Sequence, residues 1–133
     1  YMHASGTTNP ATLVNSVIFS NEAAQYGGGV YCAGPPASFS PIVNCTIVSN
    51  LAGEDGGGAH AYWTRFVNDI LYFNEAPKNP NYLGGAFTAS CTTPNPGAGN
   101  VEEDPLLAGF AGGRLRPSCS GAQPTSWSGR GGP

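Results

Sequence analysis

The chain has 133 residues, of which only 10% are charged, 20 are glycine and 12 are proline, and its formal net charge is −3. One domain fits this length. The five Lys and Arg residues are too few for the basic stripe of a nucleic-acid-binding surface. No apolar run approaches the roughly 20 residues of a membrane-spanning helix. We therefore expect no nucleic-acid partner and no membrane insertion.

A short segment recurs three times along the chain, as residues 14–21, 43–50 and 67–74. Each copy opens with a Val-Asn pair, continues with apolar residues and closes with Asn. Runs of glycine follow at positions 27–29, 56–58 and 84–85. The copies are 29 and 24 residues apart. A period in the twenties, built of strands and glycines, is typical of a solenoid.

The repeats predict an all-β fold, a parallel β-helix of about four to five coils in one domain. We place the domain at residues 1–120, with a Gly/Ser/Pro-rich tail at 121–133. The expected coils lie near residues 1–29, 30–58, 59–85 and 86–120. The last coil departs from the pattern, and a degenerate terminal repeat is typical of a cap.

Alternation along each repeat predicts which side chains face the core. Val14, Val43 and Val67 are expected to point inward, as are the apolar residues Ile18, Ile47 and Leu71. The closing residues Asn21, Asn50 and Asn74 share one phase and are expected to stack as a ladder. Asn tolerates a left-handed bend, and a buried amide needs the hydrogen bonds that a neighbouring coil supplies.

Short strands follow the glycine runs, and one aromatic ring lies in each. Tyr31, His60 and Phe87 are expected to stack outward on one face. An exposed aromatic row is typical of a partner-binding surface, and aromatic rings also pack against sugars. The alternative is that the chain's own loops cover this row.

Four cysteines, Cys32, Cys45, Cys91 and Cys119, lack the paired spacing of a zinc site. An even number with this composition favours disulfides in a secreted protein. Of the three possible pairings we favour Cys32–Cys45 and Cys91–Cys119, because each closes a Pro/Gly-rich loop. Free thiols in the core are the alternative.

Residues 44–50, Asn-Cys-Thr-Ile-Val-Ser-Asn, with the later Gly-Gly-Gly, resemble the right-handed parallel β-helix repeats of bacterial surface proteins. That group includes pectate-lyase-like folds and polymorphic outer-membrane repeats. The segments that resemble the C-terminal end of such arrays in large secreted proteins are residues 91–94, 99–106 and 114–119. The chain departs from that pattern at 116–119, which is one residue shorter, and at Ser120-Gly121, where the family usually has Ile-Asp-Ala-Gly. The resemblance implies a right-handed helix, but β-helices serve as lyases, hydrolases, adhesins and inert stalks.

No catalytic motif stands out, and we expect no enzyme activity. A β-helix lyase needs a basic residue beside acidic calcium ligands, yet the basic residues are few: Arg65, Lys78, Arg114, Arg116 and Arg130. If the chain is an enzyme, a polysaccharide lyase or a glycoside hydrolase is the expected class. No cofactor is expected; carboxylates at 54–55 or 102–104 suit Ca²⁺ chemically, but solvated loop carboxylates are the simpler interpretation. Asp69, at an inward position, is expected to form an ion pair or hydrogen bonds if it is buried, with Arg65 as the candidate partner, rather than to be catalytic.

Open strand edges at both ends of a parallel β-helix favour pairing with another chain. The expected function is therefore a non-enzymatic structural protein, extracellular or on the cell surface, whose coils stack end to end into a fibre or surface array. Its expected partner is the chain itself. The alternative is a carbohydrate-binding or carbohydrate-active module, or an adhesin fragment, with a polysaccharide as the partner of the Tyr31, His60 and Phe87 face.

Overall fold

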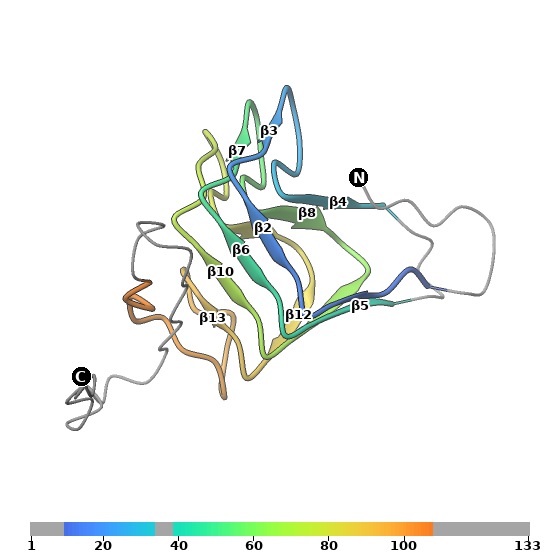
Figure 1. The fold of residues 1–133 in the computed structure, drawn as a ribbon, viewed down its shortest axis with the longest axis vertical. Coiled ribbons are helices and arrows are strands. Elements are labelled where there is room, and N and C mark those ends of the chain that lie inside the picture. The colour runs from blue at the N-terminus through green and yellow to red at the C-terminus, as the bar shows by residue number, and fades with distance from the viewer. Residues whose placement is uncertain (1–9, 34–38, 108–133) are drawn as a thin grey trace, which may run out of the picture.

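The computed structural model describes residues 10–33 and 39–107. This part of the chain forms thirteen short strands and no helix, and every strand pair is parallel (Figure 1). The fold is therefore all-β, as predicted. No helix that is long and apolar enough to span a membrane occurs among these residues. The expected tail at 121–133 lies outside the described residues.

The strands form four parallel sheets. The first sheet contains β1 (Leu13–Val14), β5 (Ser40–Val43), β9 (Thr64–Val67) and β12 (Ala86–Thr88). The second contains β2 (Val17–Phe19), β6 (Thr46–Val48), β10 (Ile70–Tyr72) and β13 (Cys91–Thr92). The third contains β4 (Val30–Cys32), β8 (Ala59–Ala61) and β11 (Tyr82–Leu83). The fourth contains β3 (Glu22–Ala23) and β7 (Leu51–Ala52).

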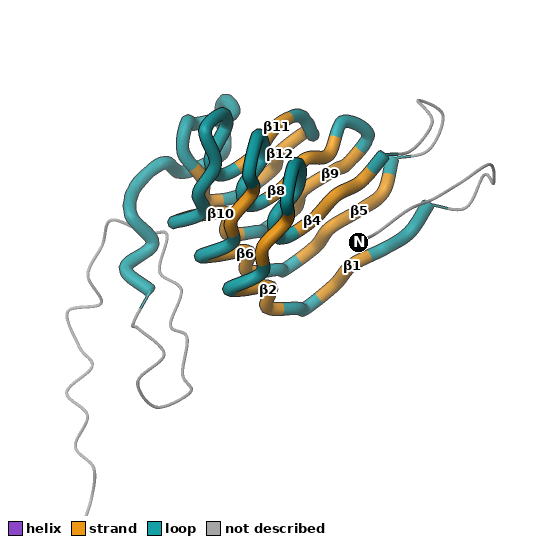
Figure 2. Tube along the Cα trace, turned by 90° about the horizontal axis from the view of Figure 1, so that it is seen from above, coloured by secondary structure: helices purple, strands orange, loops and turns teal. Residues whose placement is uncertain are grey.

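The chain visits these sheets in a fixed order, one strand at a time. It runs through β1, β2, β3 and β4, then repeats the order with β5, β6, β7 and β8. A third pass contributes β9, β10 and β11, and a fourth contributes β12 and β13. Figure 2 shows the passes lying side by side. Register pairs Ile18 with Ile47 and Ile47 with Leu71, which is the column that the repeats predict.

A corner separates the first sheet from the second in each pass, and it corrects part of the predicted alternation. The corner residues are Asn15, Asn44 and Asn68, with φ of 49°, 55° and 56°. Asn adopts this left-handed backbone more readily than most residues do. The prediction that the preceding valines face inward was wrong, because the bend breaks the alternation. Val14 is 49% exposed, whereas Ile42, just before Val43, is fully buried.

The core lies between the sheets and is built from aliphatic and aromatic side chains of successive passes. Ile42, Phe66, Ile47 and Leu71 are completely buried. Phe87 on the fourth pass stacks on Phe66 with ring centroids 4.4 Å apart. Burying such side chains stabilises each pass by about 1.5–3 kcal/mol per residue, so the passes depend on one another for stability.

Candidate functional site

The three predicted ladder asparagines lie in one row and bind one another directly. Asn50 Oδ1 accepts hydrogen bonds from the backbone N–H and the side-chain amide of Asn21, at 3.1 and 3.0 Å. Asn74 Oδ1 receives the same pair from Asn50, at 2.9 and 3.0 Å. Asn81 extends the row, since its Oδ1 accepts from Asn74 at 3.1 and 3.2 Å. Sequence reasoning missed Asn81, which follows Asn74 by seven residues and is out of phase with the repeat.

This row has a direction. Each Oδ1 accepts from the asparagine that precedes it in the row, so Asn21, the first residue of the row, has no preceding asparagine to donate to its Oδ1. This Oδ1 receives no hydrogen bond from any described residue. Asn50 and Asn74 are buried, with 1% and 5% of their surface exposed. A buried amide that is fully hydrogen-bonded fixes the register of its neighbours.

The corner asparagines form a second, exposed row with the opposite direction. Asn68 Nδ2 donates to Asn44 Oδ1 at 2.7 Å, and Asn44 Nδ2 donates to Asn15 Oδ1 at 3.2 Å. The Nδ2 of Asn15 is therefore the terminal donor, and no described residue accepts from it. The Val-Asn pairs of the sequence are the signal for this row, but alternation alone assigned them no role.

The next residue in each pass turns its side chain back toward the interior. In three passes this residue is a hydroxyl or thiol donor to the carbonyl two residues earlier. Ser16 donates to Val14 O at 2.8 Å, and Ser90 donates to Thr88 O at 3.0 Å. The thiol of Cys45 makes the corresponding contact at 3.4 Å. Asp69 occupies the same position in the third pass.

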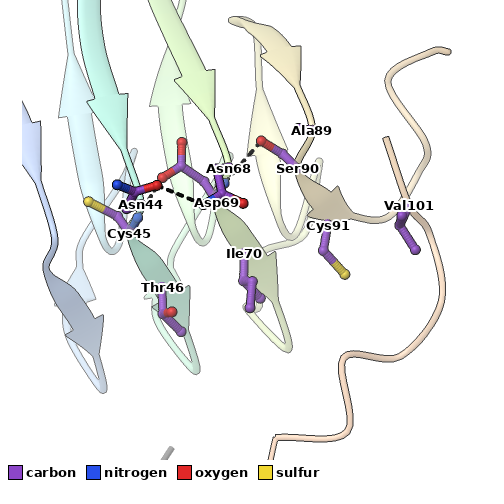
Figure 3. Close-up of a pocket in the computed structure, with 10 residues that line it drawn as sticks. All are labelled: Asn44, Cys45, Thr46, Asn68, Asp69, Ile70, Ala89, Ser90, Cys91 and Val101. Carbon is purple, nitrogen blue, oxygen red and sulfur yellow. Dashed lines mark hydrogen bonds between the residues drawn. The ribbon is translucent and has the colours of Figure 1, made fainter. Parts of the chain in front are cut away.

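Asp69 borders a pocket of ≈ 290 Å³ at this corner (Figure 3). The pocket is lined by Asn44, Cys45, Thr46, Asn68, Asp69, Ile70, Ala89, Ser90, Cys91 and Val101. Figure 3 shows the Asp69 carboxylate directed toward the Cys45 corner, whereas Ile70 points the other way. The carboxylate is thus held between two passes rather than presented to a ligand.

The Asp69 carboxylate has backbone partners. Its two oxygens accept from Cys45 N at 2.7 Å and from Val67 N at 2.8 Å. Burial raises the pKa of Asp69 to about 7, and the two N–H groups offset only part of this effect. The expected pair with Arg65 is replaced by these bonds: Arg65 is exposed on β9, and its guanidinium lies 5.7 Å from the Phe39 ring centroid.

Asp69 makes the stability of the fold pH-dependent. Its pKa is higher folded than unfolded, so folding takes up a proton and the added stability is present at low pH. We expect the free energy of unfolding to fall as pH rises from 4 to 7, by at most about 4 kcal/mol, and to level off above pH 7. Urea unfolding at several pH values measures this. Asp69→Asn should flatten the dependence, while Glu22→Gln controls for the loss of one exposed carboxylate; equal slopes in all three proteins would contradict the assignment.

The structure corrects the predicted Cys32–Cys45 disulfide. Both residues are free, buried thiols. Alternation on β4 turns Cys32 into the core, and the corner directs the Cys45 thiol to a carbonyl of its own pass. Cys91 is not one of the free thiols. Its predicted partner, Cys119, lies outside the described residues, so the Cys91–Cys119 pair stays a prediction.

The predicted aromatic face is formed in part. Tyr31 and His60 are register neighbours in the third sheet, and their rings stack with centroids 5.3 Å apart. Placing Phe87 beside them was wrong. Leu83 is the next residue in that row, whereas Phe87 lies in the first sheet and packs in the core. The reason is that Gly84 and Gly85 form a later corner, after the third-sheet strand, rather than preceding it as the glycine triplets do.

Two tyrosines take the place of Phe87 around His60. Tyr26 and Tyr62 have ring centroids 5.1 and 5.2 Å from the His60 ring. They are 41% and 56% exposed. The neighbouring Glu54 carboxylate raises the pKa of Tyr26. We call Tyr26, Tyr31, His60 and Tyr62 the aromatic patch.

The carboxylates considered for Ca²⁺ are engaged with neighbouring polar side chains. Gln25 Nε2 donates to Glu54 Oε1 at 3.2 Å, and Asn79 Nδ2 donates to Asp55 Oδ1 at 2.8 Å. Thr93 Oγ1 donates to Glu102 Oε1 at 2.9 Å. Within residues 10–33 and 39–107, no group of three or more His, Cys, Asp or Glu side chains is placed to hold a metal ion.

The two ends of the described stack differ. At the end formed by the last passes, residues 93–107 contact β13 and β12. Asn100 accepts from Ser90 N at 2.9 Å and donates to Phe87 O at 3.3 Å. Val101 exchanges backbone bonds with Ser90 and Thr92, at 2.8 and 2.9 Å. We call residues 93–107 the cap.

The cap also covers part of the outer surface of the second sheet. Val48, Ile70 and Cys91 are buried there, with Leu107 packed against them. The Tyr72 hydroxyl donates to Glu102 O at 2.8 Å. At the opposite end, β2 is the edge strand of the second sheet. The edge strands of the other three sheets at this end are β1, β3 and β4. We call this side the open end.

Comparisons of the chain with protein-family models, curated proteins and solved structures found no match.

Proposed function

We propose that this chain is a non-enzymatic structural protein outside the cell, a right-handed parallel β-helix of four to five coils that associates end to end. The observation that carries the proposal is the directed row from Asn21 to Asn81. Its buried amides join pass to pass, and its terminal acceptor at Asn21 has no donor among the described residues. An asparagine Oδ1 that accepts a hydrogen bond between passes can also accept one from a strand that another chain adds to the stack.

The distribution of polar groups supports a structural role. Three buried polar side chains make bonds from pass to pass: Asn50, Asn74 and Asp69 each bridge neighbouring passes. The extracellular location rests on the low charge content and on the resemblance to secreted β-helix repeats. The cap favours association through the open end, because at the other end Val101 already pairs with β13 and the Asn100 side chain bonds to β12.

Sedimentation of the full chain tests this function. We expect reversible association that grows with protein concentration, and electron microscopy should show particles longer than one chain. Monodisperse monomers at millimolar concentration would contradict the proposal.

Carbohydrate binding is the second candidate, and the aromatic patch favours it. Tyr26 and Tyr62 present exposed rings beside the Glu54 carboxylate, and sugars stack on such rings while carboxylates accept from their hydroxyls. A glycan array with the wild type and with Tyr26→Ala/Tyr62→Ala separates the candidates. Binding that is lost in the double variant supports this second function.

A further inference from the structure

A cavity of ≈ 310 Å³ lies among the turns that precede the strands of the third sheet. Parallel bridges pair Tyr26 with Asp55, and Asp55 with Lys78, so these three residues form one row across three passes. The backbone of the stacked passes therefore fixes the spacing of this row. The cavity is lined by Tyr26, Gly53, Glu54, Asp55, Pro77 and Lys78.

Tyr26 belongs both to this cavity and to the aromatic patch. It lines the cavity, and its ring centroid lies 5.1 Å from that of His60. The His60 ring also contacts Tyr62, with centroids 5.2 Å apart. Tyr26 and Tyr62 are both exposed. Because the two exposed rings pack against the same imidazole, a short oligosaccharide that enters the cavity can also contact Tyr62.

The polar side chains of the cavity suit sugar hydroxyls. Gln25 Nε2 holds Glu54 Oε1, and Asn79 Nδ2 holds Asp55 Oδ1, so both carboxylates are positioned before a ligand arrives. No described residue donates to Asp55 Oδ2. Hydrogen bonds from a hydroxyl to an ionised carboxylate are strong. The exposed ammonium group of Lys78 adds a donor for a sugar oxygen.

The charge of the lining selects against acidic sugars. It holds two carboxylates and one ammonium group, those of Glu54, Asp55 and Lys78. Glu54, and more weakly Asp55, raise the pKa of Tyr26, so a negative charge at this ring is disfavoured. A uronate or a sulfated sugar would bring such a charge to the same place. The hydroxyls of an uncharged sugar can instead donate to the carboxylates.

We propose that this cavity is the anchoring subsite for an uncharged polysaccharide, holding one sugar unit against Tyr26 while the following units stack on Tyr62. Pockets for small molecules begin at about 300 Å³, so this cavity suits a single sugar unit. This rests on the second candidate function, carbohydrate binding at the aromatic patch, and adds to it an anchoring site and a ligand class.

A glycan array printed with uncharged and with uronate-containing oligosaccharides, probed with the full chain, tests the ligand class. We expect binding to uncharged glycans and none to uronates. Calorimetric titration with the best-bound oligosaccharide then compares variants. Tyr26→Ala should bind about tenfold more weakly or worse, because the stacking surface is lost. Tyr26→Phe keeps the ring and should change the affinity by about twofold or less.

Two further variants sharpen the test. Glu54→Gln/Asp55→Asn keeps the shape of the cavity but removes its negative charge, so it should bind the uncharged ligand more weakly and discriminate less against uronates. Phe73→Ala removes an exposed ring that contacts Tyr72 and does not line the cavity. It should leave binding unchanged. Far-ultraviolet circular dichroism verifies that each variant is folded.

The failures are distinguishable. Preference for uronates over uncharged glycans, or binding that Tyr26→Ala leaves intact, would overturn this site and leave carbohydrate binding standing. No binding to any glycan on the array would overturn both.

Discussion

Asn50→Ala is expected to lower the free energy of unfolding by about 4 kcal/mol, because a buried group that loses its hydrogen-bond partner costs about 1–3 kcal/mol and several lose theirs here. Asn50 Oδ1 accepts from Asn21 N and Nδ2, and Asn50 Nδ2 donates to Ile18 O and Val48 O at 3.1 Å. Its side chain is 1% exposed, so water cannot replace these bonds.

Asn44→Ala is the matched control. Asn44 belongs to the corner row and is exposed, so water can satisfy its partners. Its loss should cost about 2 kcal/mol, from exposed hydrogen bonds and from placing alanine at the left-handed φ of 55°. Urea unfolding followed by far-ultraviolet circular dichroism measures both changes. Equal losses at the two positions would mean that the buried row does not hold the passes together.

Gly58→Ala is expected to destabilise the fold by about 3 kcal/mol or more. A Cβ at position 58 would lie 2.6 Å from Asn74 Nδ2 and also against the carbonyl oxygen of Asn81. Both groups are fixed by the ladder, so neither side can move without breaking hydrogen bonds. The close approach of successive passes therefore explains the glycine at this position.

Gly99→Ala separates this steric effect from backbone strain. Gly99 has φ of 82°, and a Cβ there would meet no atom within 4 Å. Its substitution should cost about 1 kcal/mol, from the left-handed backbone alone. Thermal unfolding of both variants measures the two losses of stability. If Gly58→Ala were no worse than Gly99→Ala, the passes would not pack as closely as described.

The repeats predicted those features that depend on phase. Equal spacing of Ile18, Ile47 and Leu71 predicted one interior column, and register confirms it. The asparagine row was predictable for the same reason. Stacked passes place residues with the same position in the repeat next to one another. The spacing in the sequence is therefore enough to predict which of them are neighbours in the structure.

Features that break phase were not predictable in this way. The corner at Asn15 reverses which side of the chain faces inward, so Val14 is exposed. The third pass reaches its third-sheet strand before its glycines, so Phe87 lies in the core instead of the aromatic patch.

A cap-like last coil was predicted, but the individual contacts of residues 93–107 and of Asn81 were not, because these residues belong to no repeat. Asn81 completes the row from within the third pass, and its side chain donates to Thr93 O at 3.0 Å. Whether these residues form such contacts depends on neighbours that are distant in the sequence. Likewise the buried carboxylate of Asp69 took backbone partners from Cys45 and Val67 instead of Arg65.

Nuclear magnetic resonance of the side-chain amides tests the stacked passes most directly. The Nδ2 protons of Asn50 should show cross-peaks to protons near Ile18 and Asn74, which lie 32 and 24 residues away, and they should exchange slowly with solvent. Asn44, in the exposed row, should exchange much faster. Rapid exchange at Asn50, with contacts only to its sequence neighbours, would contradict a fold built from passes joined by this row.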